Sequence, residues 1–114
     1  MDLGVKWYND TNLPLPLGLD MIRRDLGESW AQTMQTALRD SIQYAFDHED
    51  DAIKYAMSFG RGIDPETCKT FVKMYVNEDT LDLGTEGIQA LTTLYGKAIE
   101  VGAIAEMPPL DVVQ

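Results

Sequence analysis

Basic residues are scarce in this chain: 9 lysines and arginines stand against 19 aspartates and glutamates, which gives a formal net charge of −10. Such an excess of carboxylates repels nucleic-acid phosphates and anionic lipid headgroups. We therefore expect no nucleic-acid partner and no membrane partner. Long apolar runs are also missing, because no stretch approaches the roughly 20 residues that a membrane-spanning helix needs.

Cysteine and histidine occur once each, as Cys68 and His48. A single cysteine excludes an internal disulfide and, with no secretory signal at the N-terminus, predicts a cytoplasmic protein. Because no second histidine or cysteine stands at ligand spacing, the sequence predicts no metal site, and without a phosphate-cradling glycine loop it predicts no cofactor. We interpret His48 as the junction of two helices and Cys68 as a buried small apolar side chain.

Only five prolines occur, and two of them alternate with leucines near the start, where Thr11–Gly18 has the sequence TNLPLPLG. Alternating prolines remove every second backbone donor, which excludes a helix interior or a central strand. We expect residues 1–24 to form an extended, hinge-like arm. Within this arm, a short helical turn is expected around Val5–Asp10 and a short strand over residues 19–25.

Apolar residues recur at helical spacing from residue 25 onward. Asp25 and Glu28 have the spacing of a capping box, and the pattern after them predicts a helix over residues 28–47. Steps of three and four residues place one apolar stripe on this helix. Its members are Trp30, Met34, Ala37, Leu38, Ile42, Ala45 and Phe46.

Capping residues and helix-breaking residues predict three further helices. The clearest start is Asp64-Pro65, where a capping aspartate precedes a proline at the first helical position. These three helices are expected over residues 49–59, from Pro65 to near Asn77, and over residues 85–102. Short connections favour antiparallel neighbours. The predicted fold is therefore mainly α, a single domain over residues 1–114 in which about four helices pack antiparallel within residues 25–114, preceded by the proline-containing arm.

Four segments occur in a distinctive order: DLGVKWYNDTNLPLPLG, RRDLGES, MYVNEDTLDLGTEG and PPLDVV. Together they resemble the C-terminal portion of the 1,4-dihydroxy-6-naphthoate synthases of the futalosine route to menaquinone, from Asp2 to about Val113. The resemblance implies a fragment of a periplasmic-binding-protein type 2 fold, with the TNLPLPLG segment as a crossover between two lobes. Asn12 stands where that family usually has glycine, and asparagine is among the residues that best tolerate a positive φ.

The proposed catalytic histidine of this family lies shortly upstream of the segment that resembles Asp2–Gly4. The resemblance therefore implies that this chain lacks that histidine, and His48 does not occupy its place. Most of the sheet-forming sequence of both lobes is missing as well. The apolar helix faces would then pack against each other, against a second copy, or against a separate chain.

Three functions are consistent with this resemblance. The first, favoured by the missing residues, is a non-catalytic, self-associating helical protein that is not an enzyme by itself. The second is a subunit of a split synthase that needs a companion chain to supply the missing lobe. The third is a small-molecule binding module for aromatic carboxylates, for which the resemblance implies binding residues near the crossover: Trp7, Leu15, Pro16, Leu17 and Gly18.

Overall fold

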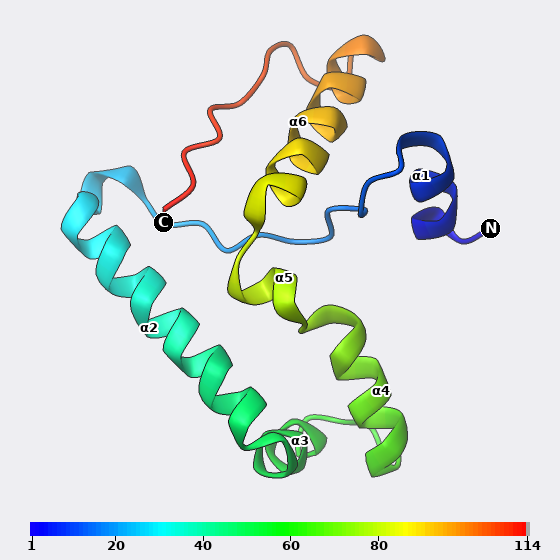
Figure 1. The fold of residues 1–114 in the computed structure, drawn as a ribbon, viewed down its shortest axis with the longest axis vertical. Coiled ribbons are helices and arrows are strands. Elements are labelled where there is room, and N and C mark those ends of the chain that lie inside the picture. Colours follow the sequence, from blue (N-terminus) through cyan, green and yellow to red (C-terminus); the bar gives the residue numbers. More distant parts are fainter. Residues whose placement is uncertain (114) are drawn as a thin grey trace. The chain divides into compact units, whose positions relative to one another are not determined.

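The structure, a computed structural model, describes residues 1–113, and these form six α-helices, one 3-10 turn and no strand (Figure 1). The elements are α1 (Leu3–Thr11), the 3-10 turn η1 (Arg24–Leu26), α2 (Glu28–Asp47), α3 (Glu49–Met57), α4 (Pro65–Tyr75), α5 (Glu78–Leu81) and α6 (Gly84–Glu100). The mainly α fold class is confirmed. The periplasmic-binding-protein type 2 fold and the single domain stay predictions.

The chain divides into two compact units, which we describe separately. The first unit combines Met1–Ile22 with Leu83–Val112, and the second consists of Arg23–Asp82 together with Val113. The first thus contains α1 and α6, and the second contains η1 and α2 to α5.

Helix α1 of the first unit is longer than the expected helical turn. It begins after Asp2, whose carboxylate accepts a hydrogen bond from the Val5 N–H at 3.0 Å. It ends at Asn12, which has a φ of 57° and donates its N–H to the Tyr8 carbonyl at 2.7 Å. Asn12 therefore occupies the left-handed conformation that closes a helix, as its tolerance of positive φ predicts.

Helix α6 carries the core of the first unit. Ala90 and Leu91 are 1% and 3% exposed, and Leu13 from the arm is 8% exposed. The helix is closed by Gly102, which has a φ of 70°, and by a hydrogen bond of 2.8 Å from the Ala103 N–H to the Ala98 carbonyl. The chain then turns back and continues as an extended C-terminal tail (Figure 1).

In the second unit, α2 and α4 run in opposite directions as two arms joined by α3 (Figure 1). Helix α3 contacts both arms, and α5 contacts α2. The start of α4 is the one predicted: Pro65 is its first residue, and the Asp64 carboxylate accepts hydrogen bonds from the Thr67 N–H at 3.0 Å and its hydroxyl at 2.6 Å. These two hydrogen bonds lower the pKa of Asp64, and the bond from the Thr67 hydroxyl has the larger effect.

The prediction of a strand over residues 19–25 is wrong, and so is the prediction of a capping box formed by Asp25 and Glu28. A strand needs a partner for its backbone groups, and the described residues contain no other strand. The Asp25 carboxylate instead accepts a hydrogen bond from Arg23 Nε at 2.9 Å. The cap position of α2 is taken by Gly27, which has a φ of 83°.

A capping box does occur at α5, a short helix that lies between two of the helices expected from the sequence. The Asn77 side chain accepts a hydrogen bond from the Asp79 N–H at 2.9 Å, and the Thr80 hydroxyl accepts the Asn77 N–H at 3.1 Å. These bonds satisfy N–H groups that a helix start leaves without intrahelical partners. Helix α4 ends at Tyr75, and these bonds start a new helical turn directly after Asn77.

Candidate functional site

The residues predicted to bind a ligand lie on α1 and on the extended segment after it. Trp7 is fixed at the start of that segment, because its indole N–H donates to the Pro14 carbonyl at 2.9 Å. The Thr11 hydroxyl donates to the Trp7 carbonyl at 2.8 Å and accepts the Leu13 N–H at 3.2 Å. The structure therefore brings Trp7 next to the residue that directly precedes Leu15–Gly18.

These residues differ in how far solvent reaches them. Trp7, Leu15 and Pro16 are half-buried, whereas Leu17 is 68% exposed and Gly18 is exposed. Leu17 therefore offers exposed apolar surface on the same extended segment whose Pro14 carbonyl holds the indole. Its use for aromatic carboxylates stays a prediction.

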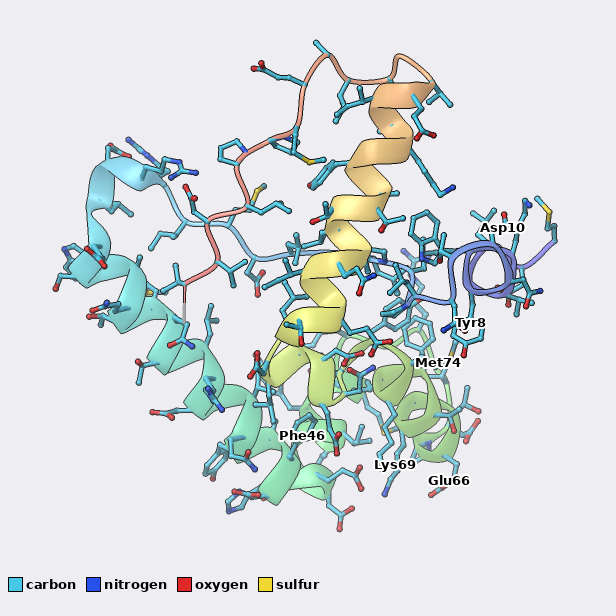
Figure 2. The ribbon with its side chains drawn as sticks, turned by 45° about the horizontal axis from the view of Figure 1, so that its top comes forward. Tyr8, Asp10, Phe46, Glu66, Lys69 and Met74 are labelled. Carbon is cyan, nitrogen blue, oxygen red and sulfur yellow. The ribbon has the colours of Figure 1, made fainter. Side chains whose placement is uncertain are left out.

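Helix α1 also carries an exposed ion pair between Lys6 and Asp10. Figure 2 labels Tyr8 and Asp10 on this helix. Lys6 Nζ lies 2.8 Å from an Asp10 carboxylate oxygen, and this hydrogen bond lowers the pKa of Asp10. Both side chains are about half exposed, so the ion pair contributes little to stability.

Sequence reasoning missed a groove of about 750 Å³ in the second unit. It lies between the end of α2, α3, the end of α4 and the start of α5, and Phe46 projects into this region from α2 (Figure 2). Its apolar lining consists of Ala45, Phe46, Ala52, Ile53, Val72 and Val76. Helical periodicity marks most of these residues as apolar, but it does not reveal which helix faces enclose a space.

Glu49 at the start of α3 forms the polar edge of this groove. Its two carboxylate oxygens bind Lys69 and Lys73 of α4, the latter at 2.6 Å. Hydrogen bonds from Lys69 and then Lys73 lower the pKa of Glu49, and the same pairing raises the pKa of Lys69. Because both of its oxygens are engaged, Glu49 connects α3 to α4 rather than acting as a free acid or base.

His48 and Cys68 have the structural roles that the sequence predicts. His48 ends α2 and precedes α3, its ring stacks on Tyr44 with centroids 4.0 Å apart, and its Nδ1 lies 2.9 Å from the Tyr44 carbonyl oxygen. Cys68 is 4% exposed within α4. Over residues 1–113, no three histidine, cysteine or acidic side chains are grouped so that they could hold a metal ion. In the same residues, no helix is long and apolar enough to cross a membrane.

The N-terminal half of α2 carries a row of exposed apolar side chains, which we call the α2 row. Trp30, Met34 and Leu38 make up this row and are 60%, 43% and 42% exposed. They stand four residues apart and therefore share one face of the helix. No residue of this helix is buried, so the stripe identified in the sequence is only partly covered within the described residues.

Comparison with known proteins identifies the class of protein to which this helical arrangement belongs. The menaquinone biosynthesis family matches residues 1–100. The chain is therefore a member of that family, as the four sequence segments indicate.

Particular relatives are the 1,4-dihydroxy-6-naphthoate synthases of Thermus thermophilus and Streptomyces coelicolor, which are 38% and 33% identical over 108 residues. The match covers 95% of this chain but only 40% and 38% of those proteins. A crystal structure of a protein from Archaeoglobus fulgidus is 42% identical with a TM-score of 0.87, covering 91% of this chain and 39% of that one. The chain thus spans about two fifths of the length of its relatives.

Proposed function

We propose that this chain provides the helical C-terminal portion of a naphthoate synthase of menaquinone biosynthesis and does not catalyse the reaction by itself. The observation that carries the proposal is the match to 40% and 38% of two proteins named as that synthase. About three fifths of each relative therefore lies outside the match. Glu49, whose oxygens are both engaged by lysines, supports a structural role for the groove edge.

The test is a reconstitution assay. The unmatched part of the Thermus thermophilus synthase is produced alone, this chain is produced alone, and the two are co-expressed. Formation of 1,4-dihydroxy-6-naphthoate from the substrate of the Thermus enzyme is then measured. We expect turnover only from the co-expressed pair; turnover by this chain alone, or none by an intact complex, would refute the proposal.

A second candidate is the non-catalytic and self-associating protein, for which the exposed α2 row is also a usable surface. Exposed apolar side chains on one helix face are a common means of pairing two copies. Light scattering after size exclusion over a concentration series distinguishes the two candidates. A dimer or larger oligomer that persists on dilution supports self-association, whereas a monomer supports the need for a companion chain.

The Trp7 ring, which the Pro14 carbonyl holds against the segment that carries Leu17, favours a third candidate, the binding module for aromatic carboxylates. Trp7 emission can be titrated with benzoate and naphthoate in a Trp30→Phe background, which removes the other tryptophan. Saturable quenching that Leu17→Ala weakens would support this candidate. A flat titration would exclude Trp7, Leu15, Pro16, Leu17 and Gly18 as a binding site for this class of ligand.

A further inference from the structure

We infer that the α2 row and the neighbouring groove form one docking surface for the polypeptide that corresponds to the unmatched three fifths of the naphthoate synthases. This inference rests on the proposed function and names the surface through which the chain would join its companion. It concerns only the second unit, within which both features lie.

The first step is the continuity of the apolar surface. Ala45 follows Leu38 by seven residues, or about two helical turns, and therefore lies on the same side of α2. Ala45 also lines the groove. The row thus leads directly into the groove, where Phe46 and Ile53 continue the apolar lining.

The second step is the length of helix that this surface occupies. Amphipathic helices are held in place mainly by packing of their apolar face rather than by helix propensity. Helix α2 has 20 residues and no buried one, and Trp30 at its start is 60% exposed. Single exposed apolar residues are ordinary, but three in line beside an apolar groove indicate a face that a partner covers.

The third step selects the occupant. The same fold, at a TM-score of 0.87, forms 39% of the longer Archaeoglobus fulgidus chain, so these helices occur where additional polypeptide is available. A second copy is the weaker choice, because pairing two chains that each carry a net charge of −10 brings like charges together. The family's remaining polypeptide therefore fits this surface better.

The experiment measures binding and not turnover. The chain is co-expressed with the unmatched part of the Thermus thermophilus synthase and purified through a tag on the chain. Met34→Lys places a charge in the α2 row, and Gln43→Lys adds the same charge to an exposed position of the same helix outside the row. We expect Met34→Lys to weaken binding by roughly 30-fold, as at the centre of an interface, and Gln43→Lys to leave it unchanged.

A second readout leaves the surface intact. In a Trp7→Phe background, Trp30 is the only tryptophan of this chain. With a companion whose own tryptophans are replaced by phenylalanine, Trp30 emission should shift to shorter wavelength and resist iodide quenching on binding. The helical circular dichroism of each variant confirms that a loss of binding is not a loss of folding. If Met34→Lys disturbs the helix, the emission of Trp30 alone decides whether the companion covers the α2 row.

The outcomes separate this inference from the proposed function. If an active complex forms, binds equally well with Met34→Lys and leaves Trp30 solvated, the docking surface is refuted but the proposed function stands. A complex that depends on Met34 but makes no product keeps the surface and overturns the function. Failure to co-purify, a Trp30 already shielded in the chain alone, or a homodimer broken by Met34→Lys would each overturn the inference.

Discussion

Truncation of Leu91 to alanine tests whether α6 anchors the first unit. Leu91 is 3% exposed, and Leu91→Ala removes three carbons, a transfer loss of about 2.4 kcal/mol at roughly 0.8 kcal/mol for each. The remaining cavity adds to this loss, but a core with few buried side chains can partly collapse around it. We therefore expect the free energy of unfolding to fall by about 2 to 3 kcal/mol.

The loss should be measured by urea unfolding in a Trp30→Phe background, so that Trp7 reports on the first unit. Leu17→Ala is the matched control, because it removes the same atoms from a side chain that is 68% exposed. Surface substitutions of this kind change stability by about 0.5 kcal/mol or less.

Comparison of the two variants decides whether the described core is correct. A loss of about 2 kcal/mol or more for Leu91→Ala, with almost none for Leu17→Ala, agrees with α6 as the anchor. Equal losses would refute the reasoning, since they would mean that α6 does not bury Leu91 in solution. A lower unfolding slope in Leu91→Ala would instead indicate that the first unit was already open before denaturant was added.

Three further predictions concern charge and backbone. The pKa of Glu49 is lowered from 4.5 in the folded chain. The stabilising effect of its ionised carboxylate is therefore complete above that pH and disappears as the pH falls through the lower folded value. Calorimetry from about pH 3 to 6 should show that stability falls more steeply with acid in the wild type than in Glu49→Gln. At Asn12, with a φ of 57°, Asn12→Ala should cost about 1 kcal/mol in urea unfolding, whereas Asn12→Gly should not; a more stable alanine variant would contradict the left-handed cap. In α6, Gly96→Ala has open space around the new Cβ and should gain about 0.5 to 1 kcal/mol, whereas Gly87→Ala would place its Cβ against the Leu83 side chain and should gain less or lose; equal gains would show that this leucine moves aside freely.

The helices of this chain could be predicted because their signals are local. Asp64 and Pro65 start α4 with groups that act within one turn. Gly102 closes α6 with a positive φ, as a glycine after a helix predicts. Such signals depend on neighbouring residues alone, so they are recognisable in the sequence even when the surrounding fold is unknown.

The errors arose where two local signals compete. Asp25 had the spacing of a cap, but the nearby guanidinium of Arg23 binds its carboxylate. Gly27 then takes the cap position of α2. In the same way, Asn77 could either end a loop or start a helix, and its bond with Thr80 decides for α5. A sequence pattern shows which groups can pair, but it does not show which of two possible partners a group takes in the fold.

The candidate sites were harder to predict because they depend on packing between helices. Periodicity identified one apolar stripe on α2, yet the structure divides it into Ala45 and Phe46, which line the groove, and the exposed α2 row. Nothing in the repeat of the stripe distinguishes the covered part from the exposed one, since both follow the same spacing. The pairing of Glu49 with Lys69 and Lys73 was also missed, because these lysines stand twenty or more residues further along the chain.

Local capping signals specify where the helices of this chain begin and end, whereas tertiary packing buries few of its apolar side chains. Apolar residues make up 45% of the sequence, but the buried apolar side chains of the described residues are only Leu13, Ile53, Cys68, Ala90 and Leu91. Caps such as Asp64 and Asn12 specify the helix ends without help from a core, whereas the apolar face of α2 has no buried residue. A polypeptide that covers the α2 row would bind the folded helix and not the unfolded chain, so its binding would stabilise the second unit by mass action. On the proposed function, assembly with the remaining three fifths of a synthase and completion of the core would be the same event.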